Sequence, residues 1–88
     1  MGQRAFHAGQ LSTVLGQTIR QHLEFSEGLL ATRIGVSPDT MTRWLNGRSP
    51  INVDYFAAIA YELGISPGDL MREAVEKLST ESELSLRR

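Results

Sequence analysis

Two short amphipathic segments with a three-residue break between them constrain the fold of this chain most, and they lie between Ser26 and Pro50. Apolar residues recur at the spacing of one helix face in both segments, at Leu30, Ala31 and Ile34 and again at Met41, Trp44 and Leu45. The break at residues 35–37 reads Gly-Val-Ser. The pattern therefore predicts two helices, residues 27–34 and 38–46, joined by a tight turn.

The residues at the ends of these segments are of the types that begin and end helices. Ser26 and Ser37 are suited to the N-cap position, and Pro38 follows Ser37 at the first helical position. Gly35 stands where a helix ends in the left-handed conformation. Ala31, four residues earlier, is small enough for a second helix to cross closely. Together these signals predict a helix-turn-helix.

A polar stripe runs along the second of these helices, opposite its apolar residues, at Asp39, Thr42, Arg43 and Asn46. The second helix of a helix-turn-helix enters the DNA major groove and reads base edges with its N-terminal half. We therefore predict that Pro38, Asp39, Thr42 and Arg43 read bases, with Arg43 suited to guanine O6 and N7. The alternative is an ordinary solvated helix face. Asp39 has an equal structural alternative, which is to hold Arg43 or to complement the helix N-terminus.

The residues named so far belong to a longer set of characteristic positions, which comprises Ala31, the turn at 35–37, Thr40, Met41, residues 44–47, Pro50, Ala57, Ala60, residues 63–66 and Leu70. With these residues, the stretch 26–70 resembles the phage-repressor type of helix-turn-helix, the lambda repressor-like or Cro/C1-type domain. The resemblance implies an all-α fold, a compact bundle of five helices with the helix-turn-helix at its second and third helices. It also implies binding to operator DNA, usually as a two-fold dimer. The sequence departs from the family at Glu27, where the family usually has a glutamine that contacts a phosphate, and at Gly28, a poor residue inside a helix.

Five residues are predicted to contact DNA phosphates: Arg33, Ser37, Asn46, Gly47 and Arg48. The family places the second helix across the DNA backbone, which makes Arg33 a candidate contact. Gly47 allows backbone amides to approach a phosphate closely, and Arg48 adds positive charge beside it. The alternatives are a solvated arginine at position 33 and an ordinary Asn-Gly turn after the reading helix.

Apolar spacing predicts three further helices, at residues 10–23, at 53–63 and from Ser66 to about 78. Their apolar residues are Leu11, Val14, Leu15, Ile19 and Leu23 in the first, and Leu70, Met71, Ala74, Val75 and Leu78 in the last. In the helix at 53–63 a broad buried face is expected from Val53, Phe56, Ala57, Ile59, Ala60 and Leu63. The chain then divides into a flexible arm at 1–9, one DNA-binding domain at 10–78 and a polar, frayed tail at 79–88.

The apolar stripe of the last helix is long for a bundle that four helices already close. Met71, Val75 and Leu78 are therefore candidates for the dimer interface. The alternative is that the whole stripe covers the core of its own subunit.

Composition narrows the classes of function. The 88 residues include no cysteine and two histidines that lie outside the predicted motif, so we expect no metal site, no cofactor and no enzymatic activity. No apolar run approaches the ~20 residues of a membrane span, and we expect a cytoplasmic protein. The net charge is −1, but residues 1–50 hold five arginines against three carboxylates. The predicted reading helix thus lies in a modestly basic half.

The sequence therefore predicts a transcriptional regulator that binds double-stranded operator DNA, of the phage or prophage repressor or Cro-like kind, and that acts as a homodimer. One alternative is an antitoxin-type regulator, which also binds a toxin protein. A second is a protein-interaction module that keeps the fold and has lost DNA binding, which Glu27 and the nearly neutral charge favour.

Overall fold

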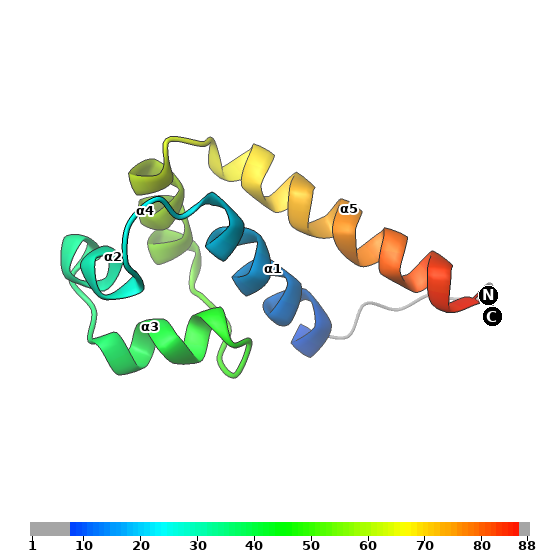
Figure 1. The fold of residues 1–88 in the computed structure, drawn as a ribbon, viewed down its shortest axis with the longest axis horizontal. Helices are drawn as coiled ribbons and strands as arrows, with labels where there is room; N and C mark the ends of the chain where they lie inside the picture. Colours follow the sequence, from blue (N-terminus) through cyan, green and yellow to red (C-terminus); the bar gives the residue numbers. More distant parts are fainter. Residues whose placement is uncertain (1–7, 87–88) are drawn as a thin grey trace.

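The computed structural model describes the backbone of residues 8–86 and the side chains of residues 10–80. Five helices follow one another along this part of the chain: α1 (Ala8–His22), α2 (Glu27–Ile34), α3 (Pro38–Leu45), α4 (Val53–Leu63) and α5 (Pro67–Leu86) (Figure 1). The all-α, five-helix prediction is confirmed. Most of the predicted N-terminal arm lies outside the described residues, and none of the described helices is long and apolar enough to span a membrane.

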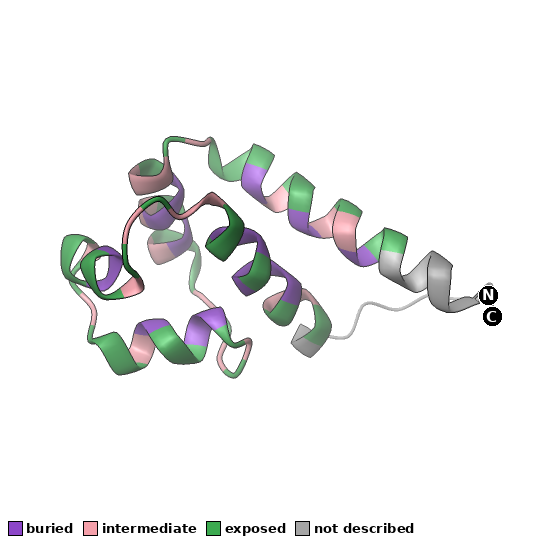
Figure 2. Ribbon diagram, in the orientation of Figure 1, coloured by how far each residue is buried: buried purple, intermediate pink, exposed green. Residues whose placement is uncertain are grey.

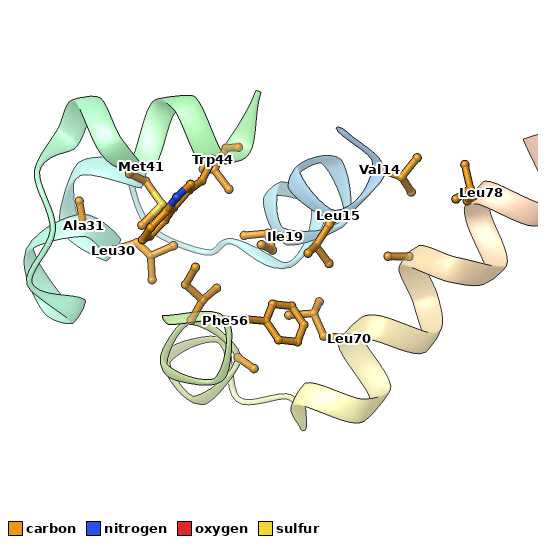
Figure 3. Packing of buried hydrophobic residues seen from close by; sticks show 14 residues of the cluster. Val14, Leu15, Ile19, Leu30, Ala31, Met41, Trp44, Phe56, Leu70 and Leu78 are labelled. Atoms are coloured by element: carbon orange, nitrogen blue, oxygen red, sulfur yellow. The ribbon is translucent and has the colours of Figure 1, made fainter. Parts of the chain in front are cut away.

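α1 lies at the centre of the bundle, where it packs against α3 on one side and α5 on the other (Figure 1). α2 packs against both α3 and α4, and α4 also contacts α5. Each helix contributes buried residues to one common core, and these residues are purple in Figure 2. Figure 3 shows Val14 of α1 pointing toward Leu78 of α5, at the far end of the core from the helix-turn-helix.

α5 continues to Leu86, well past residue 78, where the apolar spacing placed its end. Two polar contacts join α1 to α5 in addition to the apolar packing between these helices. His22 Nε2 lies 2.8 Å from Glu73 Oε1, and Lys77 Nζ donates to Gln21 Oε1 at 2.7 Å. The long helix is thus attached along α1 by both apolar and polar contacts.

The helix boundaries of the helix-turn-helix follow from their caps. The Ser26 hydroxyl accepts from the Leu29 amide at 3.0 Å, and the Ser37 hydroxyl accepts from the Thr40 amide at 3.1 Å. Gly35 has φ of 81° and its amide donates to the Ala31 carbonyl, which ends α2 in the left-handed conformation. The predicted turn at 35–37 is therefore confirmed.

The buried face of α4 is narrower than its sequence predicts. Phe56, Ile59 and Ala60 are buried, whereas Val53 is 80% exposed and Ala57 is also exposed. The prediction was wrong for Val53 and Ala57, because apolar residues continue around α4 beyond the side that faces the bundle. Periodicity alone cannot tell an apolar residue that faces the core from a neighbour that faces water.

Candidate nucleic-acid interface

α3 is held in the bundle by three buried apolar side chains. Met41 and Leu45 are each 1% exposed and Trp44 is 8% exposed. The Trp44 ring lies 5.4 Å from the Tyr55 ring of α4, centre to centre, at an interplanar angle of 43°. In Figure 3, Met41 and Trp44 point from α3 into the same space as Leu30 of α2. The opposite side of α3 must therefore face outward.

The end of α3 lies unusually close to α1, and two glycines make this approach possible. A Cβ atom on Gly16 of α1 would lie 2.2 Å from the carbonyl oxygen of Leu45. A Cβ atom on Gly47, which has φ of 76°, would lie 2.4 Å from the Thr13 hydroxyl. The role of Gly16 was not predicted, although a glycine inside an otherwise regular helical pattern was its signal in the sequence.

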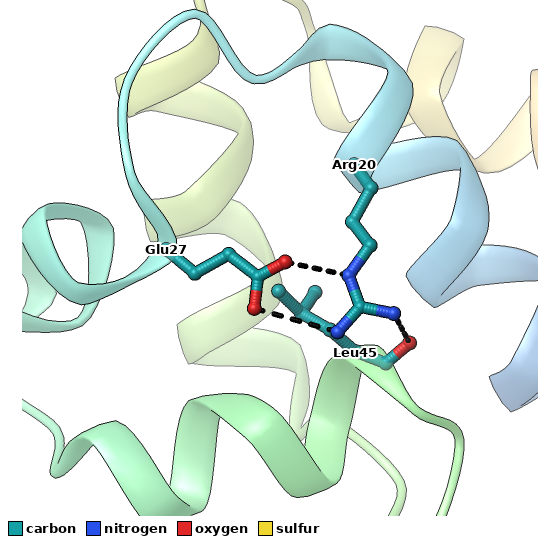
Figure 4. A network of polar contacts seen from close by, with 3 residues as sticks. All are labelled: Arg20, Glu27 and Leu45. Atoms are coloured by element: carbon teal, nitrogen blue, oxygen red, sulfur yellow. Dashed lines mark hydrogen bonds and ion pairs between the residues drawn. The ribbon is translucent and has the colours of Figure 1, made fainter.

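Arg20 connects α1, α2 and α3 next to this contact (Figure 4). Arg20 of α1 donates from Nε to Glu27 Oε2 of α2 at 2.6 Å and from Nη2 to Glu27 Oε1 at 3.4 Å. Its Nη1 donates to the Leu45 carbonyl at the end of α3, at 3.3 Å. Glu27, which stands where the family usually has a phosphate-contacting glutamine, has its carboxylate engaged by this arginine. The residue therefore connects helices of the scaffold.

The outward side of α3 carries all four predicted base-reading residues. Pro38, Asp39, Thr42 and Arg43 are exposed. Arg43 Nη1 donates to Asp39 Oδ2 at 2.5 Å, and the two side chains are 49% and 78% exposed respectively. The structure therefore contains the contact with Arg43, which is one of the structural roles considered for Asp39 beside base reading.

The predicted phosphate contacts after the turn and after α3 have different roles. The Ser37 hydroxyl is occupied at the cap of α3, where it accepts from the Thr40 amide and donates to the Thr40 hydroxyl. The amides of Gly47 and Arg48 donate to carbonyls of α3 at 3.1 and 2.9 Å. These amides close the end of α3 and Gly47 lies against Thr13, so the described contacts of the glycine are within the domain, and its phosphate contact stays a prediction.

Asn46 and Arg48 keep exposed side chains on the loop that follows α3. Most of the cationic side chains in the described part of the chain pair with other side chains, namely Arg20, Arg33, Arg43, Arg72 and Lys77. Within that same part of the chain, Arg48 has neither a hydrogen bond nor an ion pair from its guanidinium. An exposed guanidinium beside α3 that has no partner among the described residues is suited to a phosphate.

Arg33 is directed toward the scaffold. Its Nη1 donates to Glu62 Oε1 of α4 at 3.2 Å, and its guanidinium carbon lies 5.2 Å from the centre of the Phe25 ring. Half of the side chain is nevertheless exposed. The bond to Glu62 ties α2 to α4, and the contact with Phe25 ties α2 to the segment that precedes it; neither role was predicted for Arg33.

The three dimer candidates of α5 are largely used within the subunit. Leu78 is 6% exposed and belongs to the core, so it offers almost no area to a second copy. This burial removes Leu78 from the candidate dimer surface. Met71 and Val75 are half-buried, and Met71 packs against the core. The large apolar side chains most exposed in the described part of the chain are Val53 and Tyr61 on α4.

Comparison with known proteins agrees with this geometry. The model of the Cro/C1-type HTH DNA-binding domain matches residues 17–72, more than half of the chain. The crystal structure of the clp gene regulator ClgR from Corynebacterium glutamicum superposes with a TM-score of 0.80 at 23% identity, over 85% of this chain and 83% of that chain. No curated protein matches at a significant level. The structural likeness shows the fold, and the sequence match shows the family: this chain belongs to the Cro/C1-type helix-turn-helix DNA-binding domains.

Proposed function

We propose that this protein is a sequence-specific transcriptional regulator of the phage-repressor type, which occupies operator DNA and excludes polymerase from it. The observation that supports this most is the two-sidedness of α3. Trp44 and its apolar neighbours fix one side in the core, while Asp39, Thr42 and Arg43 lie exposed on the other. A helix fixed in this way can enter the major groove without rearranging the bundle.

The charges near α3 favour specific over non-specific binding. Three of the arginines near the interface already have partners, namely Arg20, Arg33 and Arg43. Phosphate contacts by unpaired cations supply most of the non-specific affinity of DNA-binding proteins. Arg48 is the described cation best placed to supply such a contact. We therefore expect weak binding to random duplex and a strong dependence on base contacts.

Dimer formation on DNA is part of the proposal. Two reading helices related by a two-fold axis would contact half-sites about 10–10.5 base pairs apart, or a multiple of one helical turn. Two weak half-site contacts combined in this way give useful affinity without a strongly basic surface. Met71 and Val75 remain the proposed dimer contacts on α5.

Operator selection with the purified protein tests this function. The protein is mixed with random duplexes, the bound fraction is amplified, and the enriched sequences are measured for affinity at several salt concentrations. Enrichment of a two-fold symmetric site, bound more weakly as salt increases, supports the proposal. Failure to enrich any sequence over several rounds would contradict it.

Replacement of Arg48 by alanine is expected to weaken binding to the selected operator and to random duplex by the same factor. A phosphate contact carries no base information, so no position of the operator changes its preference. The slope of log affinity against log salt should become shallower by about 1. Arg72→Ala is the matched control, because Arg72 is also exposed but lies on α5. An Arg48→Ala variant that changes base preference would show that Arg48 reads sequence.

A further inference from the structure

We propose that Asp39 and Arg43 form one reading unit, in which Asp39 positions the Arg43 guanidinium for a guanine and disfavours its use on phosphate. This inference rests on the proposed function, since it needs a DNA sequence to read. It assigns Asp39 a role in specificity that requires no contact between Asp39 and a base. Asp39 is thus a positioning residue for Arg43.

The geometry leaves the arginine able to bind guanine while it is held. Asp39 and Arg43 are one helical turn apart, and the contact joins Arg43 Nη1 to Asp39 Oδ2 at 2.5 Å. A guanidinium has five N–H donors, of which this contact uses one. The remaining hydrogens of Nη1 and Nη2 can still fork onto guanine O6 and N7. The ion pair and the base contact are therefore compatible in one conformation.

The energetics favour a role in recognition over a role in folding. Exposed ion pairs one helical turn apart contribute little to the stability of a fold, and both of these side chains are about half exposed or more. Ordering a long side chain at an interface, in contrast, costs about 2- to 12-fold in affinity. The ion pair with Asp39 already restricts the Arg43 rotamer before DNA binds. Binding therefore has less of this ordering cost to meet.

The charge of Asp39 acts in the same direction. Its side chain is 78% exposed on the side of α3 that would face the duplex. There it opposes approach to phosphates of any sequence, since like charges repel. The Asp39 carboxylate also offsets the positive charge of Arg43 as long as Arg43 is not bound to a guanine. Arg48 is the contrast, because its guanidinium has no such partner within the described part of the chain.

Asp39→Asn tests the inference, because asparagine keeps the size of the side chain and removes its charge. Affinity is measured on the selected operator, on random duplex, and on an operator changed at the base pair whose preference Arg43→Ala abolishes. The expected result is about 2- to 10-fold weaker preference for guanine at that pair, with tighter binding to random duplex. In an Arg43→Ala background, Asp39→Asn should change no base preference and should still strengthen random binding.

Asp69→Asn is the matched control. Asp69 also lies in the first turn of a helix, and it pairs with Arg72 at 3.0 Å on an exposed surface of α5. Like Asp39→Asn, the Asp69→Asn substitution removes one negative charge and one exposed ion pair, but it does so at a distance from α3. This control variant should leave both the guanine preference and the random binding at wild-type values.

Two results overturn the inference and are easily told apart. If wild-type protein selects an operator but Asp39→Asn keeps the full guanine preference, Asp39 does not position Arg43, and the proposed regulator function stands. If wild-type protein selects no sequence, the proposed function fails and the inference fails with it. Thermal unfolding of each variant, followed by circular dichroism, confirms that the changes in binding occur in folded protein.

Discussion

Replacement of Trp44 by alanine is expected to lower the free energy of unfolding by about 3–5 kcal/mol. Trp44 is 8% exposed, and its indole fills the space between α3 and α4, beside Tyr55. A domain of this length has a total stability of about 4–13 kcal/mol. The variant would therefore lose a large part of its stability, and its Tm would fall by at least about 12 °C. Urea unfolding followed by circular dichroism measures the change.

Thr42→Ala provides the control for this measurement. Thr42 lies on the same helix with its side chain exposed, so its replacement should change the stability by no more than about 0.5 kcal/mol. The contrast between the two variants measures how strongly the inward side of α3 anchors the helix. Equal stability of Trp44→Ala and Thr42→Ala would contradict the packing described for α3.

Replacement of Gly16 by alanine is expected to destabilise the domain by about 1–3 kcal/mol, which is the usual effect of overpacking a core. The new Cβ would lie 2.2 Å from the Leu45 carbonyl oxygen and 2.7 Å from its carbon. These are backbone atoms that no side-chain rotation can move. The end of α3 would have to shift, although alanine favours a helix over glycine by about 1 kcal/mol. Thermal unfolding should show a Tm lower by about 4–24 °C.

Gly28→Ala is the matched control, since Gly28 also lies within a helix. Its nearest neighbour for an added Cβ is the Ser26 hydroxyl at 3.9 Å, and its φ is not positive. The substitution should therefore stabilise the domain by about 0.4–1 kcal/mol. The two Gly→Ala variants are thus expected to change stability in opposite directions. A Gly16→Ala variant at least as stable as the wild type would show that α1 and α3 are not in close contact at this point.

The turn and the orientation of α3 could be predicted from the sequence because local chemistry determines them. Ser37 caps α3 through its own hydroxyl, and Gly35 adopts the left-handed conformation that few other residues tolerate. The apolar spacing of Met41 and Trp44 then determines which side of α3 is buried. Each of these signals lies within a few residues of its effect.

Contacts between distant residues could not be predicted in this way. Nothing near Arg20 in the sequence indicates that it bonds both Glu27 and the Leu45 carbonyl, because the tertiary fold brings these groups together. The same holds for Arg33 and its partner Glu62, which are 29 residues apart. Gly16 likewise owes its importance to a helix that begins more than 20 residues later.

These long-range contacts explain why some residues that were predicted to contact phosphates also have partners within the domain. An arginine in a helix-turn-helix can bind DNA or can contact other helices of the domain, and the residue type alone does not distinguish these two roles. Arg33 contacts α4 and the Phe25 ring, whereas Arg48 keeps a guanidinium with no partner in the described part of the chain. The distinction depends on where the partner carboxylates lie after folding.

Guanine methylation interference on the selected operator tests the placement of α3 in the major groove most directly. A methyl group on N7 blocks the major-groove edge of a guanine, which is the edge that Arg43 would read. We predict that methylation of one guanine in each half-site prevents wild-type binding and has no effect on Arg43→Ala, which binds the operator about 5- to 150-fold more weakly. Interference at no guanine, or the same interference pattern for both proteins, would contradict the account.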